Sequence, residues 1–137
     1  MLSEEEEQKK VVQYLRLLEN KKKIVTFFAP VNENKQSKAN RTMAIRLATK
    51  AKAVGKRAGV SDLVIIFKSE VLFLEMKVAP KVLKSGKLSF TNSKVSDNQI
   101  DFLKSVCESD VCDGIVCFGF NDAKEKIDLK IKELEND

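Results

Sequence analysis

Apolar residues along this chain follow two patterns, a helical spacing of three to four positions and short unbroken apolar runs. Helical spacing occurs in four segments: residues 3–19, about 40–54, a segment opened by Ser96, and a last segment that begins near Asn121 or Asp122. Apolar runs rich in β-branched and aromatic residues predict four strands, at residues 24–31, 60–67, 71–78 and 115–120. The predicted order is helix, strand, helix, strand, strand, helix, strand, helix.

This order predicts an α/β fold in which helices flank a central mixed β-sheet. The chain has 137 residues, which is enough to bury a core without disulfide or metal crosslinks. No repeat or linker interrupts it, so we expect residues 1–137 to form a single domain.

The first helix is expected to begin at Ser3 as its N-cap, with Glu4 to Glu7 in the first turn. Its buried stripe is expected to consist of Val11, Val12, Leu15 and Leu18. Projected toward the N-terminus, this stripe passes through Gln8, Glu5 and Glu4. At least one acid of the first turn is therefore expected to face inward.

Three later segments have distinct signals. Residues 40–54 predict a helix with a basic outer face. Residues 79–95 are rich in lysine and serine and predict a loop or a weak hairpin. Ser96 and Gln99 fit a capping box, and the helix that follows is expected to bury one stripe: Ile100, Leu103, Val106 and Cys107.

Three charges lie within or beside the two central apolar runs, namely Asp62, Glu75 and Lys77. Charges that are buried without partners are strongly unfavourable, so these three need mutual compensation or a metal ion. Side chains alternate faces along a strand, which puts Glu75 and Lys77 on one face. Asp62, on the adjoining strand, is expected to meet them if the register allows. The alternatives are a strand-edge cap at Asp62 and an exposed ion pair between Glu75 and Lys77.

Charge is unevenly distributed along the chain. The net charge is +5, but residues 38–87 carry 12 basic and only 3 acidic residues. Such a block suits a polyanion, and nucleic acid is the natural partner. The alternative is an ordinary solvated surface.

The chain has no histidine, which excludes mechanisms that use serine with histidine, cysteine with histidine, or histidine-bound metal within one chain. Its three cysteines, Cys107, Cys112 and Cys117, are expected to be buried thiols rather than zinc ligands or disulfides. The acidic N-terminus does not resemble a signal peptide and no apolar run reaches the length of a membrane span. We therefore expect a cytoplasmic protein without membrane association.

Taken together, these residues resemble the PD-(D/E)XK nuclease superfamily, and within it the VRR-NUC group of virus-type replication-repair nucleases. The resemblance lies in Gly-Val-Ser-Asp-Leu at residues 59–63, Glu-Met-Lys at residues 75–77, and Gln99 opening a helix. Glu5 with Gln8, Asn32 and Asn34, and the series Gly55, Arg57 and Gly59 extend it over nearly the whole chain. One departure is Ser61, where the family has proline, a change that affects backbone geometry more than chemistry.

The resemblance implies a restriction-endonuclease-like core and a divalent ion, Mg²⁺ or Mn²⁺, bound by Asp62, Glu75 and the backbone carbonyl of Met76. Lys77 is expected to orient or help deprotonate the attacking water, and Gln99 to steady the lysine or the water. The alternative for Gln99 is a capping role alone. Glu5 is expected to complete the metal shell, with Glu4 nearly as well placed and a purely dipole-stabilising role as the alternative.

The implied activity is that of a metal-dependent endonuclease that hydrolyses DNA phosphodiester bonds at flaps or four-way (Holliday) junctions in replication, recombination or repair. Stand-alone members of this size resemble resolvases that act as homodimers, so a homodimer is expected. The residues expected to contact nucleic acid are Asn32, Asn34, Lys35, Arg41, Lys56 and Arg57. One alternative is a catalytically impaired nucleic-acid-binding module on the same fold, and another is an interaction domain unrelated to nucleic acid.

Overall fold

The computed structural model describes residues 2–31, 41–91 and 93–136, except for the side chains of Ala44 and Ala48. The helices are α1 (Glu4–Asn20), α2 (Arg41–Ala53), α3 (Asp97–Cys107) and α4 (Phe120–Glu135). The strands are β1 (Thr26–Phe28), β2 (Leu63–Ile66), β3 (Val71–Lys77), β4 (Lys81–Val82), β5 (Leu88–Ser89) and β6 (Cys112–Phe118). The predicted order of helices and strands is confirmed, and β4 and β5 form a hairpin in the segment predicted as a loop or weak hairpin.

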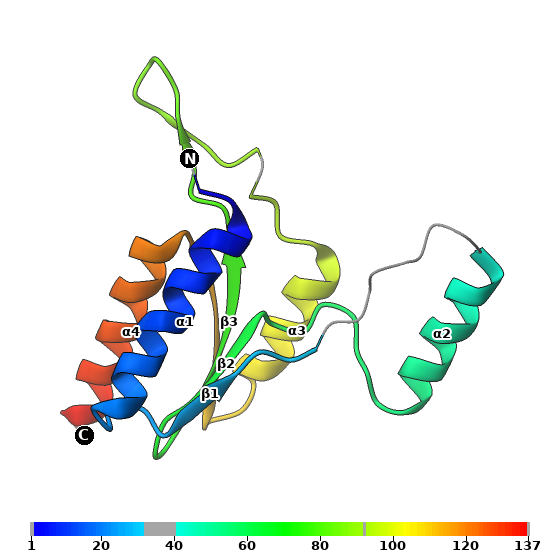
Figure 1. Ribbon diagram of the computed structural model, residues 1–137, viewed down its shortest axis with the longest axis horizontal. Coiled ribbons are helices and arrows are strands. Elements are labelled where there is room, and N and C mark those ends of the chain that lie inside the picture. The colour runs from blue at the N-terminus through cyan, green and yellow to red at the C-terminus, as the bar shows by residue number, and fades with distance from the viewer. Residues whose placement is uncertain (1, 32–40, 92, 137) are drawn as a thin grey trace.

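The main sheet has the strand order β1-β2-β3-β6. β1 and β2 pair antiparallel, as do β2 and β3, whereas β3 and β6 are parallel. Helices α1 and α4 lie together on one side of this sheet, and α3 lies on the other (Figure 1). The prediction of a mixed sheet flanked by helices is therefore confirmed.

The core lies between the sheet and the pair α1 and α4. On β3, the residues Leu72, Leu74 and Met76 are fully buried, as the alternation of strand side chains requires. The other members of this core include Val11, Leu15 and Leu18 of α1, Leu63 and Ile65 of β2, and Ile127 of α4. This arrangement turns Phe73, Glu75 and Lys77 toward the α3 side.

Strand β6 begins at Cys112, three residues before its predicted start, and α4 begins already at Phe120. Asp113 and Gly114, which precede the predicted strand, lie inside the observed strand and pair with β3. An added Cβ at Gly114 would lie 2.8 Å from the end of the Leu103 side chain, so glycine at this position allows α3 to pack closely against β6.

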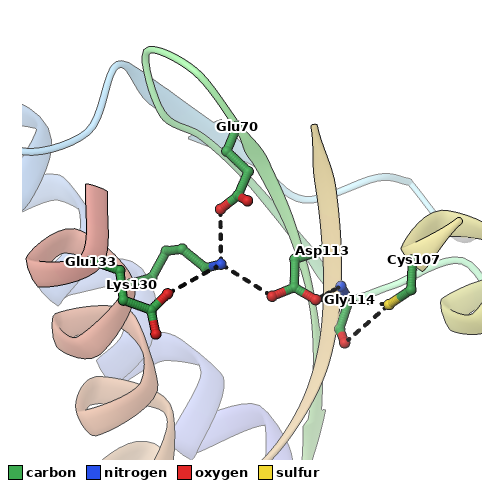
Figure 2. A network of polar contacts seen from close by, with 6 residues as sticks. All are labelled: Glu70, Cys107, Asp113, Gly114, Lys130 and Glu133. Atoms are coloured by element: carbon green, nitrogen blue, oxygen red, sulfur yellow. Dashed lines mark hydrogen bonds and ion pairs between the residues drawn. The ribbon is translucent and has the colours of Figure 1, made fainter. Parts of the chain in front are cut away.

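Asp113 is accommodated by the cluster of charges shown in Figure 2, centred on Lys130 of α4. The Lys130 ammonium lies 2.8 Å from Glu70 Oε2 and 3.1 Å from Asp113 Oδ2. Burial by itself lowers the pKa of Lys130, but hydrogen bonds and charge interactions with the two carboxylates raise that pKa overall. The cluster links the β2–β3 turn, the start of β6 and the last turns of α4.

The N-terminus of α4 is capped from another helix. Its N-cap residue is Gly119, which has a positive φ of 91° and no capping side chain. The Phe120 N–H instead donates to the Glu7 carboxylate of α1. An anionic group at this position also suits the positive end of the helix dipole. An inward-facing acid in the first turn of α1 therefore helps join α1 to α4.

Two predicted apolar stripes are less buried than expected. None of the α3 residues, all of which are described, is fully buried, because α3 packs at the sheet edge formed by β6. Helix α2 stands away from the sheet (Figure 1). The Ile45 and Leu47 side chains of its apolar stripe are 58% and 61% exposed, and Val54, just after the helix, is 77% exposed. Among the described residues, no element of the sheet covers this stripe.

The three cysteines are free thiols, but the prediction that all are buried is correct only for Cys117. Cys107 is exposed at the end of α3, where its thiol lies 3.7 Å from Asp113 Oδ1. Within the described residues, no helix is both long and apolar enough to cross a membrane.

We predict that Lys130→Ala lowers the free energy of unfolding by about 1–3 kcal/mol, because it leaves two partly buried carboxylates without their cation. Urea denaturation measures this change. The matched control is Lys9→Ala, whose partner Glu5 is an exposed neighbour one turn away, and this variant should stay within about 0.5 kcal/mol of wild type. Equal stabilities for the two variants would contradict the role given to Lys130.

Candidate active site

The ends of three elements meet at one edge of the sheet. The N-terminus of α1, the C-terminal end of β3 and the N-terminus of α3 all lie near the base of the β4–β5 hairpin (Figure 1). Each end carries a polar or charged residue singled out from the sequence. The three strand charges of the sequence are grouped here, together with an acid of α1 and Gln99 of α3.

The strand register brings Asp62 to Glu75. Leu63 pairs with Leu74 in the antiparallel ladder, so Asp62, one residue earlier, lies opposite Glu75. Opposed residues share a face of the sheet. The Met76 N–H also donates to Asp62 Oδ2 over 2.7 Å, which fixes the Asp62 carboxylate against the end of β3.

Glu75 is buried, with 2% of its surface exposed. Its Oε1 accepts a 2.6 Å hydrogen bond from Gln99 Nε2 and lies 3.8 Å from the Lys77 ammonium. Its Oε2 is buried and has no hydrogen-bond partner among the described residues. A buried carboxylate oxygen without a donor is unfavourable unless a proton or a cation reaches it.

Gln99 serves two purposes with the two ends of one amide. Its Oε1 accepts a 2.9 Å hydrogen bond from the Ser96 N–H, which completes the predicted capping box of α3. Its Nε2 donates to Glu75. Because the cap fixes the glutamine rotamer, the donor to Glu75 is held in place by the start of the helix.

Gly59 sets how closely the chain approaches this helix start. Its φ is +81°, and an added Cβ would lie 2.4 Å from the carbonyl carbon of Asn98 and 2.8 Å from the backbone nitrogen of Gln99. Only glycine fits this position without displacing α3. The segment leading to Asp62 and the residue that holds Glu75 are thus packed directly together.

Glu4 is the acid of the first helix that interacts with this group, whereas Glu5 is not placed there. Glu4 is partly buried and interacts electrostatically with Asp62 and Lys77. The Glu5 side chain is 81% exposed and lies 3.6 Å from Lys9. Glu4 precedes the fully buried Val11 by two helical turns, whereas Glu5 precedes the half-buried Val12 by the same distance, so the observed burial separates the two acids where the sequence pattern does not.

The pKa values of two carboxyl groups, Glu75 and Glu4, are raised. Burial raises the pKa of Glu75 to about 8, assisted by the charge of Asp62 and by the hydrogen bond that a protonated Glu75 carboxyl can donate to Asp62, while Lys77 acts in the opposite direction. Burial also raises the pKa of Glu4, again with a contribution from Asp62. The group is therefore short of positive charge, although the Lys77 side chain, only 12% exposed, lies within it.

These residues fit a divalent cation. Mg²⁺ and Mn²⁺ take hard oxygen ligands, and Mg²⁺ is usually bound by one or two carboxylates while it keeps several waters. Asp62 and the unpartnered oxygen of Glu75 supply that number. Within the described ranges no group of three or more acidic, cysteine or histidine side chains is arranged to hold an ion. A site here therefore depends on two carboxylates together with backbone oxygen and water.

The residues expected to contact nucleic acid are only partly described. Asn32, Asn34 and Lys35 lie outside the described residues. Arg41 opens α2, and Lys56 and Arg57 follow that helix in the segment leading to Gly59. The Arg57 guanidinium lies 5.5 Å from the centre of the Phe102 ring on α3, so this cation stays on the α3 side of the molecule.

Comparison with known proteins identifies the fold. No protein-family model matches the chain, and no curated protein matches it. Among solved structures, the chain is similar to a "VRR_NUC domain protein" with a TM-score of 0.60 and 19% sequence identity, over 96% of this chain and 90% of that one. The chain thus has the fold of a VRR-NUC domain, as the sequence predicted.

We predict that, with a chelator present, the stability difference between wild type and Glu75→Gln depends on pH. The folded protein holds the Glu75 proton up to about pH 8, whereas the ordinary pKa is 4.5. The contribution of Glu75 to the free energy of unfolding is therefore complete below pH 4.5. It is lost as pH rises toward 8, with a limiting slope of about 1.4 kcal/mol per pH unit. Urea denaturation across this range tests it, and a difference that is flat or rises with pH would contradict the assignment.

Proposed function

We propose that this chain is a divalent-cation-dependent nuclease that hydrolyses DNA phosphodiester bonds. The observation that carries the proposal is the buried Glu75 carboxylate, which is held by Gln99, opposed by Asp62 and close to Lys77. One of its oxygens has no hydrogen-bond partner in the part of the chain that the structure describes. A structural ion pair would not need that spare oxygen. The shared fold with a VRR_NUC domain protein supports the same function.

In this proposal Asp62, Glu75 and the backbone carbonyl of Met76 hold Mg²⁺ or Mn²⁺, and Glu4 adds negative charge beside them. The bound cation supplies Lewis-acid activation and offsets charge on the scissile phosphate. Lys77 places a second positive charge at the same point and orients the attacking water. Gln99 keeps Glu75 in one rotamer. Water adds to phosphorus and loses a proton, the P–O ester bond breaks, and the leaving oxygen takes up a proton, so that one phosphate monoester and one hydroxyl are formed.

Branched DNA is the proposed substrate, with flaps and four-way junctions as the candidate forms. The basic block supports a polyanionic substrate, since Lys77, Lys81, Lys84, Lys87 and Lys94 follow one another without an intervening acid. Each phosphate contact made by such lysines strengthens binding at low salt.

We also propose that the active form is a homodimer. The apolar stripe of α2 is exposed in the single chain, which is unfavourable in water unless another surface covers it. An apolar groove of about 490 Å³ lies between α3 and β6, lined by Val95, Ile100, Leu103, Cys107, Gly114 and Val116. In a symmetric dimer, α2 of each copy would bind in the groove between α3 and β6 of the other copy, so that both stripes and both grooves are covered.

We predict that purified protein cuts flap or four-way junction DNA with Mg²⁺ or Mn²⁺ and not with chelator. Glu75→Ala should lower the rate by about a thousandfold or more, because it removes a cation ligand. Gel assays on labelled synthetic junctions measure the rates. A wild type that binds DNA but never cuts it would favour the catalytically impaired alternative.

Neighbouring acids of α1 provide matched variants for the same assay. Glu4→Ala should lower the rate about tenfold, because Glu4 interacts with Asp62 and Lys77, whereas Glu5→Ala should leave it unchanged. A Mn²⁺-dependent rise in melting temperature gives a readout independent of cleavage. That rise should be present in Glu5→Ala and absent in Glu75→Gln.

We predict that the protein sediments as a dimer of 15.4 kDa chains. Leu47→Glu should shift it to the monomer, because a carboxylate on the stripe cannot be buried in an apolar groove. Leu129→Glu is the matched control, since Leu129 is equally exposed on α4. A monomeric wild type, or a dimer that is insensitive to Leu47→Glu, would refute the contact.

A further inference from the structure

The β4–β5 hairpin is a short arm that projects beyond the sheet (Figure 1). Lys81 pairs with Ser89 and Val82 pairs with Leu88. The tip is closed by two backbone hydrogen bonds, from the Leu83 N–H to Lys87 O and from the Gly86 N–H to Leu83 O. Gly86 has a positive φ of 84°, as a three-residue hairpin loop requires at this position. The arm therefore has a defined shape.

Apolar side chains on this arm are only partly covered by the described residues. Val82 and Leu88 are directly opposite each other and thus share one face, and they are 67% and 54% exposed. Phe90 at the base is also exposed over nearly half its surface. Exposed apolar pairs on a projecting ribbon are costly in water, so a bound partner is expected to cover them.

The charge around these apolar residues selects the class of partner. Residues 76–96 contain five lysines and no acidic residue. Lys84 and Lys87 lie at the tip itself. A basic rim suits phosphate groups, and apolar side chains suit the faces of bases that are no longer stacked on a neighbour. Phosphate groups and unstacked bases occur side by side where a DNA duplex is interrupted.

The base of the arm is fixed beside the candidate active site. Ser93 is buried, and its hydroxyl donates a 2.7 Å hydrogen bond to the carbonyl of Val78, the residue after Lys77. Phe90 packs edge-on against Phe118 with ring centres 5.2 Å apart, and Phe118 pairs with Lys77 in the sheet. A DNA strand bound by the arm would therefore lie at a fixed position relative to Glu75 and Lys77.

We propose that the β4–β5 hairpin is a wedge that inserts Val82 and Leu88 at a branch point of DNA while Lys84 and Lys87 contact the flanking phosphates. The inference rests on the proposed nuclease function, because it supplies the reason for branch selectivity at that site. The apolar pair would supply selectivity for branched over linear DNA, and the two lysines would supply affinity for DNA of either form. Regular duplex offers the lysines their phosphates but gives the apolar pair no unstacked base.

The test measures binding of a four-way junction and of a linear duplex with equal sequence content, in chelator, by fluorescence anisotropy. Wild type should prefer the junction. The double variant Val82→Ser with Leu88→Ser should lose at least about tenfold of this preference while its affinity for linear duplex stays the same. Lys84→Ala with Lys87→Ala should instead weaken both complexes and reduce the salt slope of each by about two.

Leu17→Ser is the matched control, because Leu17 is an exposed apolar residue on α1, and it should behave as wild type. The Mn²⁺-dependent rise in melting temperature should persist in the hairpin variants, which separates loss of the wedge from loss of folding. An unchanged junction preference in the double serine variant overturns the inference. Junction preference without metal-dependent cleavage would refute the nuclease function and leave the wedge standing.

Discussion

Burial of the Glu75 carboxylate is the constraint on which the rest of this structure depends. A carboxylate with 2% exposure is tolerated only where donors or cations replace water, and the chain supplies them incompletely. Gln99 satisfies one oxygen and Lys77 lies close to it, but Asp62 and Glu4 add negative charge. The result is a carboxyl group whose pKa is raised to about 8 and whose second oxygen has no donor among the residues that the structure describes.

The fold holds this unfavourable arrangement because each member sits on an element fixed by other contacts. Leu72, Leu74 and Met76 bury the opposite face of β3, Ser96 fixes Gln99, and Gly59 permits the close packing of α3. Ser61 is buried immediately before Asp62, and its hydroxyl has no hydrogen-bond partner among the described residues. Because that hydroxyl bonds to nothing there, an apolar residue such as proline removes no interaction at this position, and Asp62 is held through Met76 instead.

Exposed apolar surfaces also lie outside this group of charges. The α2 stripe, the groove beside α3 and the hairpin face are apolar surfaces with basic residues nearby, and none is covered within the described residues. The proposed second copy and the proposed DNA substrate would cover such surfaces.

The sequence alone determined the element order, the mixed sheet and the shared face of Glu75 and Lys77, because strand alternation is a local rule. The meeting of Asp62 with Glu75 depended on the strand register, which the structure supplied. The sequence also identified Gln99 through its capping box. The tertiary structure decided the rest: Glu4 rather than Glu5 at the cluster, the long β6 stabilised by Lys130, and the exposure of α2 and α3. Local periodicity says which residues share a face, but only packing in three dimensions decides whether another element lies against that face.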